Sequence, residues 1–220
     1  MEAGEIALYM FLICTFATLL MHPASPLRHL IHDGLFRRAL MGFLVGSTVI
    51  AIIMTPWGKR SGGHFNPAIT LTFYRLGKLA FWDAFFYIVA QFAGAAGGVG
   101  IAASVLRDAP KSSTVRYAVT VPGLFGDAGA FTGEMTISFV LMTGILFASN
   151  REPTARYTPY LVGVLYAMFI TVEATTLRHE HESCPNLRFC VWSRLLAGIL
   201  DLFDCPHTGH AGRSRSLFVG

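Results

Sequence analysis

Long apolar stretches separated by short polar segments dominate the pattern of hydrophobic and polar positions along the chain. A bilayer core about 30 Å thick needs about 20 apolar residues of helix to cross it. Stretches that reach or approach this length occupy 5–22, 38–55, 82–105, 131–149 and 159–176. The pattern therefore predicts an all-α membrane protein, a bundle of about five transmembrane helices.

A shorter apolar segment lies between the second and third stretches, at 56–80. Within it, Asn66 is a residue type favoured as a helix N-cap, and Pro67 is favoured at the first helical position. The helix predicted to begin there is too short to span a bilayer. Irregular backbone at membrane depth is tolerated only where protein or water surrounds it, so this segment predicts one re-entrant half-helix.

Composition supports a membrane protein and excludes several other classes. The 220 residues are 53% hydrophobic and 14% charged, whereas soluble domains carry roughly 25% charged residues. The net charge of +4 is spread over loops and tail, which argues against nucleic-acid binding. Acidic Glu2 and Glu5 stand where a signal peptide would carry basic residues, and the four cysteines imply no disulfide framework. We expect no cofactor and no metal.

The half-helix is the candidate functional site. Its first N–H groups have no intrahelical partner, and its dipole adds about half a positive charge at that end. Asn66 can donate from its amide to the oxygen of a neutral solute, while Gly63 and His64 precede it in a turn that can line a narrow path. Such a site passes neutral hydrogen-bonding solutes and repels cations. Asn66, Pro67, Ala68, His64 and Gly63 are the predicted pore-lining residues here.

Residues 61–70, Ser-Gly-Gly-His-Phe-Asn-Pro-Ala-Ile-Thr, resemble the first signature loop of the aquaporin, or major intrinsic protein, family, and the resemblance extends over 5–176. It implies an aquaporin-like channel for passive flux of water or a small neutral solute such as glycerol. It further implies a multi-pass protein of a plasma or inner membrane that is not an enzyme and that forms a homotetramer when complete.

The resemblance also assigns roles outside the loop. Gly4-Glu5 and Gly133-Glu134 begin two similar apolar helices, which indicates an internal repeat, and glutamates at these positions in the family accept hydrogen bonds that hold re-entrant loops. Gln91 resembles a residue of the family's third helix, although close packing through Gly94 and Gly98 explains the neighbouring glycines equally well. Counting back from the loop puts Val45 or Gly46 in the family's solute-selecting ring, with Ile170 as its fifth-helix member.

The resemblance ends after residue 176. The family continues with a second Asn-Pro-Ala triplet, an arginine and a sixth helix, whereas 177–220 is a charged, interrupted segment. Codons permitted for 175–188, read one base later, can spell PLSGMSMNPARTFA, which contains the missing triplet. We therefore divide the chain into an incomplete aquaporin-like transmembrane domain, 1–176, and an aberrant tail, 177–220, that a single inserted base has put out of frame.

As written, the chain has its sixth helix and second half-helix disrupted, so the sequence predicts that it does not conduct alone. The alternative is a non-conducting structural or regulatory membrane subunit. An intramembrane enzyme is disfavoured because Glu5, Glu134 and His64 offer no nucleophile paired with a base. The solute and the orientation in the membrane stay open at this stage.

Overall fold

The computed structural model describes residues 1–107, 109–112, 114–115 and 126–176, and everything described there is helical or connecting loop. The helices are α1 (Glu2–Met21), α2 (Pro26–Leu30), α3 (Gly34–Met54), α4 (Pro56–Ser61), α5 (Pro67–Arg75), α6 (Phe81–Leu106), the 3-10 turn η1 (Ala109–Lys111), α7 (Gly126–Ser149), α8 (Glu152–Ala155) and α9 (Thr158–Thr176). The predicted all-α class is confirmed. The tail at 177–220 lies outside the described residues.

Long apolar helices form the body of the fold. Four segments are long and apolar enough to cross a membrane, namely α1, α3, α6 and the Phe131–Ser149 part of α7. The fifth predicted span corresponds to α9, whose described apolar part, Thr158–Val172, is shorter. α5 is only 9 residues long, which fits the predicted half-helix and cannot cross a bilayer.

Two pairs of helices pack closely through small residues. α1 packs on α6, where a Cβ added at Gly94 would collide with the carbonyl of Ala3 and one at Gly98 with the carbonyl of Ala7. The predicted close packing through Gly94 and Gly98 is confirmed. Membrane helices associate through such small residues because lipid supplies no hydrophobic drive between them.

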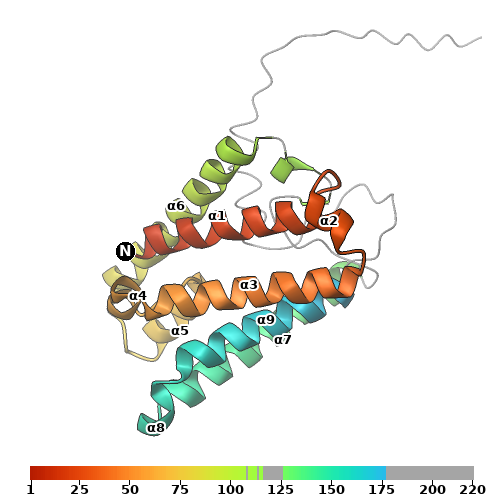
Figure 1. Cartoon of the computed structure of the whole chain (residues 1–220). Helices are drawn as coiled ribbons and strands as arrows, with labels where there is room; N and C mark the ends of the chain where they lie inside the picture. Colours follow the sequence, from red (N-terminus) through yellow and green to blue (C-terminus); the bar gives the residue numbers. More distant parts are fainter. Residues whose placement is uncertain (108, 113, 116–125, 177–220) are drawn as a thin grey trace, which may run out of the picture.

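α3 packs on α9 through small residues in the same way. A Cβ at Gly46 would collide with the carbonyl of Gly163, and one at Gly42 with that of Ala167. Figure 1 shows α3 between α1 on one side and α9 with α7 on the other, so the bundle is a row of close helix pairs. α5 packs against α6 at the end where the chain begins.

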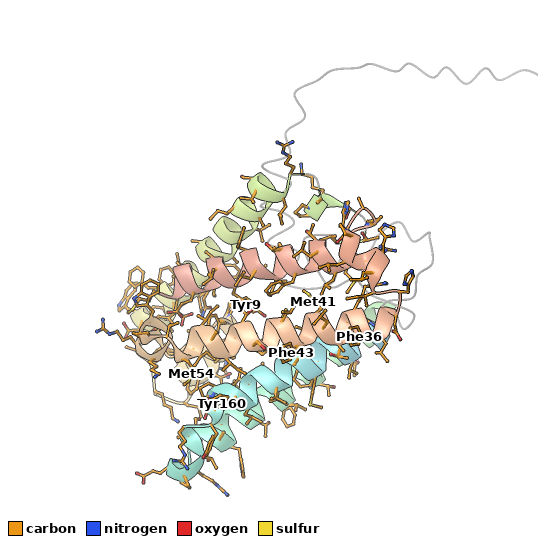
Figure 2. The ribbon with its side chains drawn as sticks, viewed as in Figure 1. Tyr9, Phe36, Met41, Phe43, Met54 and Tyr160 are labelled. Atoms are coloured by element: carbon orange, nitrogen blue, oxygen red, sulfur yellow. The ribbon has the colours of Figure 1, made fainter. Side chains whose placement is uncertain are left out.

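Side chains divide between the helix interfaces and the outer surface. Tyr9 and Met41 lie in the cluster between α1 and α3, whereas Phe36 and Phe43 are exposed on the surface of α3 (Figure 2). Large apolar side chains are similarly exposed along α6 and α7. In water such a surface would be costly, but it is the surface that a lipid environment favours.

Candidate pore site at the start of the half-helix

The turn between α4 and α5 depends on glycines. Gly62 and Gly63 have φ of +84° and +57°, in the left-handed region that costs a residue with a Cβ roughly 1–2 kcal/mol. Phe65 also has a positive φ, 51°. These conformations reverse the chain within a few residues, between the end of α4 and the start of α5.

Asn66 begins the half-helix. Its backbone is extended, with φ −144° and ψ 126°, and its side-chain Oδ1 accepts a hydrogen bond of 2.8 Å from the backbone N–H of Ala68. Pro67 occupies the first turn, where it has no N–H to leave unpaired. The predicted N-cap is therefore confirmed. In the described part of the chain the amide nitrogen of Asn66 has no partner, so it remains a donor at the positive end of α5.

A buried hydrogen-bond network anchors this turn, and Glu2 is at its centre. The backbone N–H of His64 donates to one carboxylate oxygen of Glu2 over 3.1 Å, and Gln91 Nε2 donates to the other over 3.1 Å. Gln91 Nε2 also donates to Thr70 Oγ1, which lies 3.0 Å from His64 Nδ1. α1, α6, the turn and α5 are thus joined through four side chains that are less than 10% exposed.

Glu5 contacts the same turn through a different residue. Its Oε2 accepts a hydrogen bond of 2.8 Å from Ser61 Oγ, which in turn accepts one of 3.1 Å from the N–H of Gly63. The hydroxyl of Tyr87 donates to the carbonyl of Ser61 over 2.8 Å. Glu5 therefore supports the end of α4, whereas Glu2 supports His64 and Gln91.

Sequence reasoning missed Glu2 because its position next to the first residue was interpreted only as terminal charge. A usable signal was present, since residues three apart lie on one face of a helix. Glu2 was therefore to be expected on the same helix face as Glu5, toward the same turn. Glu134, the counterpart of Glu5 in the repeat, lies in α7, but its side chain is outside the described part.

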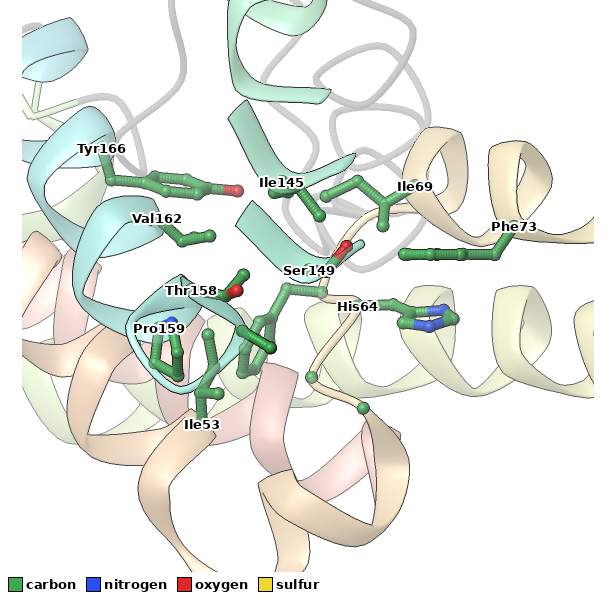
Figure 3. Close-up of a pocket in the computed structure, with 14 residues that line it drawn as sticks. Ile53, His64, Ile69, Phe73, Ile145, Ser149, Thr158, Pro159, Val162 and Tyr166 are labelled. Carbon is green, nitrogen blue, oxygen red and sulfur yellow. The ribbon is translucent and has the colours of Figure 1, made fainter. Parts of the chain in front are cut away.

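A cavity of about 250 Å³ lies beside the turn. Figure 3 shows Ile145, Val162 and Tyr166 from α7 and α9 facing Ile69 and Phe73 of α5 across it. His64 and Gly63 line this cavity, and Asn66, Pro67 and Ala68 do not. The His64 ring stacks on Phe73 with ring centres 5.1 Å apart, which holds it against the wall while its Nδ1 contacts Thr70.

The two predicted ring residues come together in a different part of the bundle. Val45 of α3 is fully buried in a cluster with Leu20 and Met41, and Ile170 of α9 packs against the same cluster. Gly46, the other predicted possibility, contacts Gly163 instead. The structure therefore places Val45 and Ile170 in one packed cluster between neighbouring helices, apart from the cavity beside His64.

These features define a class of protein: a multi-pass helical membrane protein with a re-entrant half-helix that begins at an Asn-Pro-Ala triplet. Residues 3–177 match the family described as Major intrinsic protein. The chain belongs to this family. It is accordingly a multi-pass helical membrane protein and not an enzyme, as the sequence predicts.

Individual relatives agree with this assignment. The chain is 33% identical over 134 residues to "Probable aquaporin PIP2-7" of Oryza sativa subsp. japonica, covering 59% of this chain and 46% of that protein. It is 28% identical over 179 residues to "Aquaporin PIP2-7" of Musa acuminata, covering 79% and 61%. It is 31% identical over 116 residues to "Aquaglyceroporin AqpS" of Rhizobium meliloti, covering 53% and 46%. The matched part thus spans about half the length of these relatives.

Proposed function

We propose that residues 1–176 form the greater part of a channel for passive flux of water or a small neutral solute. The observation that carries this proposal is the start of α5, where Asn66 caps the helix through its oxygen and its amide nitrogen has no partner among the residues that the structure describes. The names of the relatives, aquaporins and an aquaglyceroporin, support the same class of function.

The physical mechanism follows from that helix end. Unpaired backbone N–H groups and the Asn66 amide present donors to the oxygen of a passing solute, and the helix dipole opposes a cation. The cavity beside His64 is bounded largely by apolar side chains, so a solute there makes few competing hydrogen bonds. Because the solute is not covalently changed, the residues act only by hydrogen-bonding or excluding it, and they need no cofactor.

Solute choice rests on the proposed ring of Val45 and Ile170. Both are aliphatic, so a ring that contains them has a weakly polar wall and offers no hydrogen bonds to compete for water. This favours a solute such as glycerol, and one relative carries the name aquaglyceroporin.

One half-helix lines a pore from one side only, so the second must come from elsewhere. Codons permitted for the tail, read one base later, can spell a second Asn-Pro-Ala triplet, and we propose that the complete channel contains it and assembles as a homotetramer. The chain as written then does not conduct by itself. The second candidate function, a non-conducting subunit, rests on the observation that the printed tail contains no second triplet.

The test compares the chain as written with a version from which one base is removed near the codon for Ala174. Each is reconstituted in vesicles, and shrinkage is followed by light scattering after a step in sucrose or glycerol. We expect the corrected chain to pass solute well above empty vesicles and the chain as written to match them. Flux through the chain as written would overturn the need for a second half-helix.

A matched variant separates a pore from a leak. Asn66→Leu in the corrected chain removes both the cap and the amide donor and is expected to lower flux at least tenfold. Thr72→Val, further along α5, serves as the control, because within the described part of the chain this hydroxyl bonds only to the carbonyl of Ala68. If neither version of the chain conducts and the chain as written co-purifies with a complete channel, the subunit function replaces the channel function.

A further inference from the structure

One end of the molecule carries an exposed aromatic patch. Tyr74, Phe81, Trp82 and Phe85 form a chain of ring contacts with centroid separations of 5.4 to 6.1 Å, and Phe86 extends it. Trp82 is 64% exposed, and Trp57 on α4 is 66% exposed. Aromatic side chains at the ends of membrane helices mark the level of the headgroups.

Cations share that end of the molecule. The hydrogen bond from Tyr87 to Ser61 joins α6 to α4, and the one from Lys78 Nζ to Asn150 Oδ1, 2.8 Å, joins the turn after α5 to the turn before α8. These elements lie together at one end of the bundle (Figure 1). We call this the α4–α8 surface; its members are Trp57, Lys59, Arg60, Arg75, Lys78, Trp82, Arg151 and Arg156.

The cations on this surface are not neutralised by the protein. In the described part of the chain none of the six is ion-paired, and the only carboxylates exposed on these elements are Asp83 and Glu152. Three of the six contact neutral groups, which leave their charge in place: Lys78 donates to Asn150 Oδ1, Arg151 lies over the Phe147 ring and Arg156 lies over the Tyr157 ring.

A cavity of about 390 Å³ lies between α4 and α8 and is lined by Lys59 on one side and Arg156 on the other, with Met54, Gly58 and Pro159 as its apolar wall. Two cations across a partly apolar hollow suit a phosphate group that is attached to an acyl chain. The flanking tryptophans set this hollow at the headgroup level.

We propose that the α4–α8 surface binds the headgroup of an anionic phospholipid, with its phosphate between Lys59 and Arg156. The six cations, none of which has an ion-pair partner among the described residues, attract a negatively charged leaflet by about 1 kcal/mol per Lys or Arg near the surface, which is about fivefold per charge. A zwitterionic lipid has no net charge and gains little from them. The proposal concerns lipid binding and does not depend on whether the chain conducts.

The chain supplies its own reporters for the test. Of the three tryptophans, Trp57 and Trp82 lie on this surface, so Trp192→Phe leaves only those two fluorescent indoles. This full-length chain is reconstituted in phosphatidylcholine vesicles that contain either brominated phosphatidylglycerol or brominated phosphatidylcholine, and quenching gives the relative association of each lipid. We expect phosphatidylglycerol to be preferred about fivefold or more, and the preference to vanish near 1 M salt, where the Debye length is about 3 Å.

The variant pair Lys59→Gln with Arg156→Gln is expected to bring the preference close to one. Arg107→Gln with Lys111→Gln removes the same charge from exposed positions at the other end and should leave it unchanged. Equal quenching by the two brominated lipids in the parent chain would overturn the proposal, as would quenching by neither, which would indicate that protein covers the surface. The parent measurement and its salt dependence decide the matter even if a variant does not fold.

Discussion

Replacing Glu2 by alanine tests the network that holds the half-helix in place. The substitution removes both acceptors of the carboxylate and leaves the N–H of His64 and one N–H of Gln91 without their partner. Glu2 is 4% exposed, so water cannot easily replace it. Each buried unsatisfied donor costs about 1–3 kcal/mol, so the expected loss in the free energy of unfolding for two donors is about 2–6 kcal/mol.

An ordinary hydrogen bond between membrane helices contributes less free energy than this expected loss. Ordinary interhelical hydrogen bonds in a bilayer average about 0.6 kcal/mol in double-mutant cycles, so a loss near that value would mean that Glu2 is one bond among many. Glu2→Gln keeps an oxygen for one donor and is expected to lose roughly half as much as Glu2→Ala. The exposed Glu152→Ala, which also removes a carboxylate from a first helical turn, is the control for charge alone.

The free energy of unfolding is measured by titration with SDS in mixed micelles, and amide hydrogen exchange is measured over 58–70. We expect Glu2→Ala to raise exchange specifically in this peptide, because the His64 N–H loses its acceptor, while peptides from α9 stay protected. Exchange over 58–70 equal to that of the parent, together with a stability change no larger than for Glu152→Ala, would refute the anchoring role of Glu2.

Three further predictions test neighbouring features. Gly98→Val should lower the free energy of unfolding by about 1–3 kcal/mol because its Cβ would meet Ala7, whereas Gly97→Val has open space and should not; SDS titration compares them. Asn66→Ala should cost about 1 kcal/mol through the lost cap in the same titration, with Asn66→Asp retaining most of the stability. Hydrogen bonds from the backbone N–H groups of Phe36 and Leu35 lower the pKa of the exposed Asp33 carboxyl. Its cap of α3 therefore contributes stability that is fully present above pH about 4 and is lost as the pH falls through the lowered pKa. Asp33→Asn should remove this part of the acid dependence in a series of unfolding curves at different pH.

The half-helix could be predicted from local sequence because its causes are local. Asn66 and Pro67 set the start of α5 through backbone geometry that depends on adjacent residues, and the lengths of the apolar stretches bound the helices. The close helix packing through Gly94 and Gly98 could also be predicted, because two glycines four residues apart lie on one helix face and let a neighbouring membrane helix approach closely. By contrast, Glu2 bonds to residues 62 and 89 positions away, and no local pattern encodes such partners.

The sequence by itself determined the class of fold, the apolar helices, and the place where the half-helix begins. Of the predicted spans, α9 alone has a described apolar part that is shorter than expected. These features were predictable because hydrophobic length and capping are properties of consecutive residues. Only the tertiary structure decided which carboxylate holds His64, that Val45 and Ile170 pack in one cluster, and that Lys59 and Arg156 line one hollow. Those outcomes depend on the direction in which each helix face points and on what packs against it, and the linear order of residues does not contain that information.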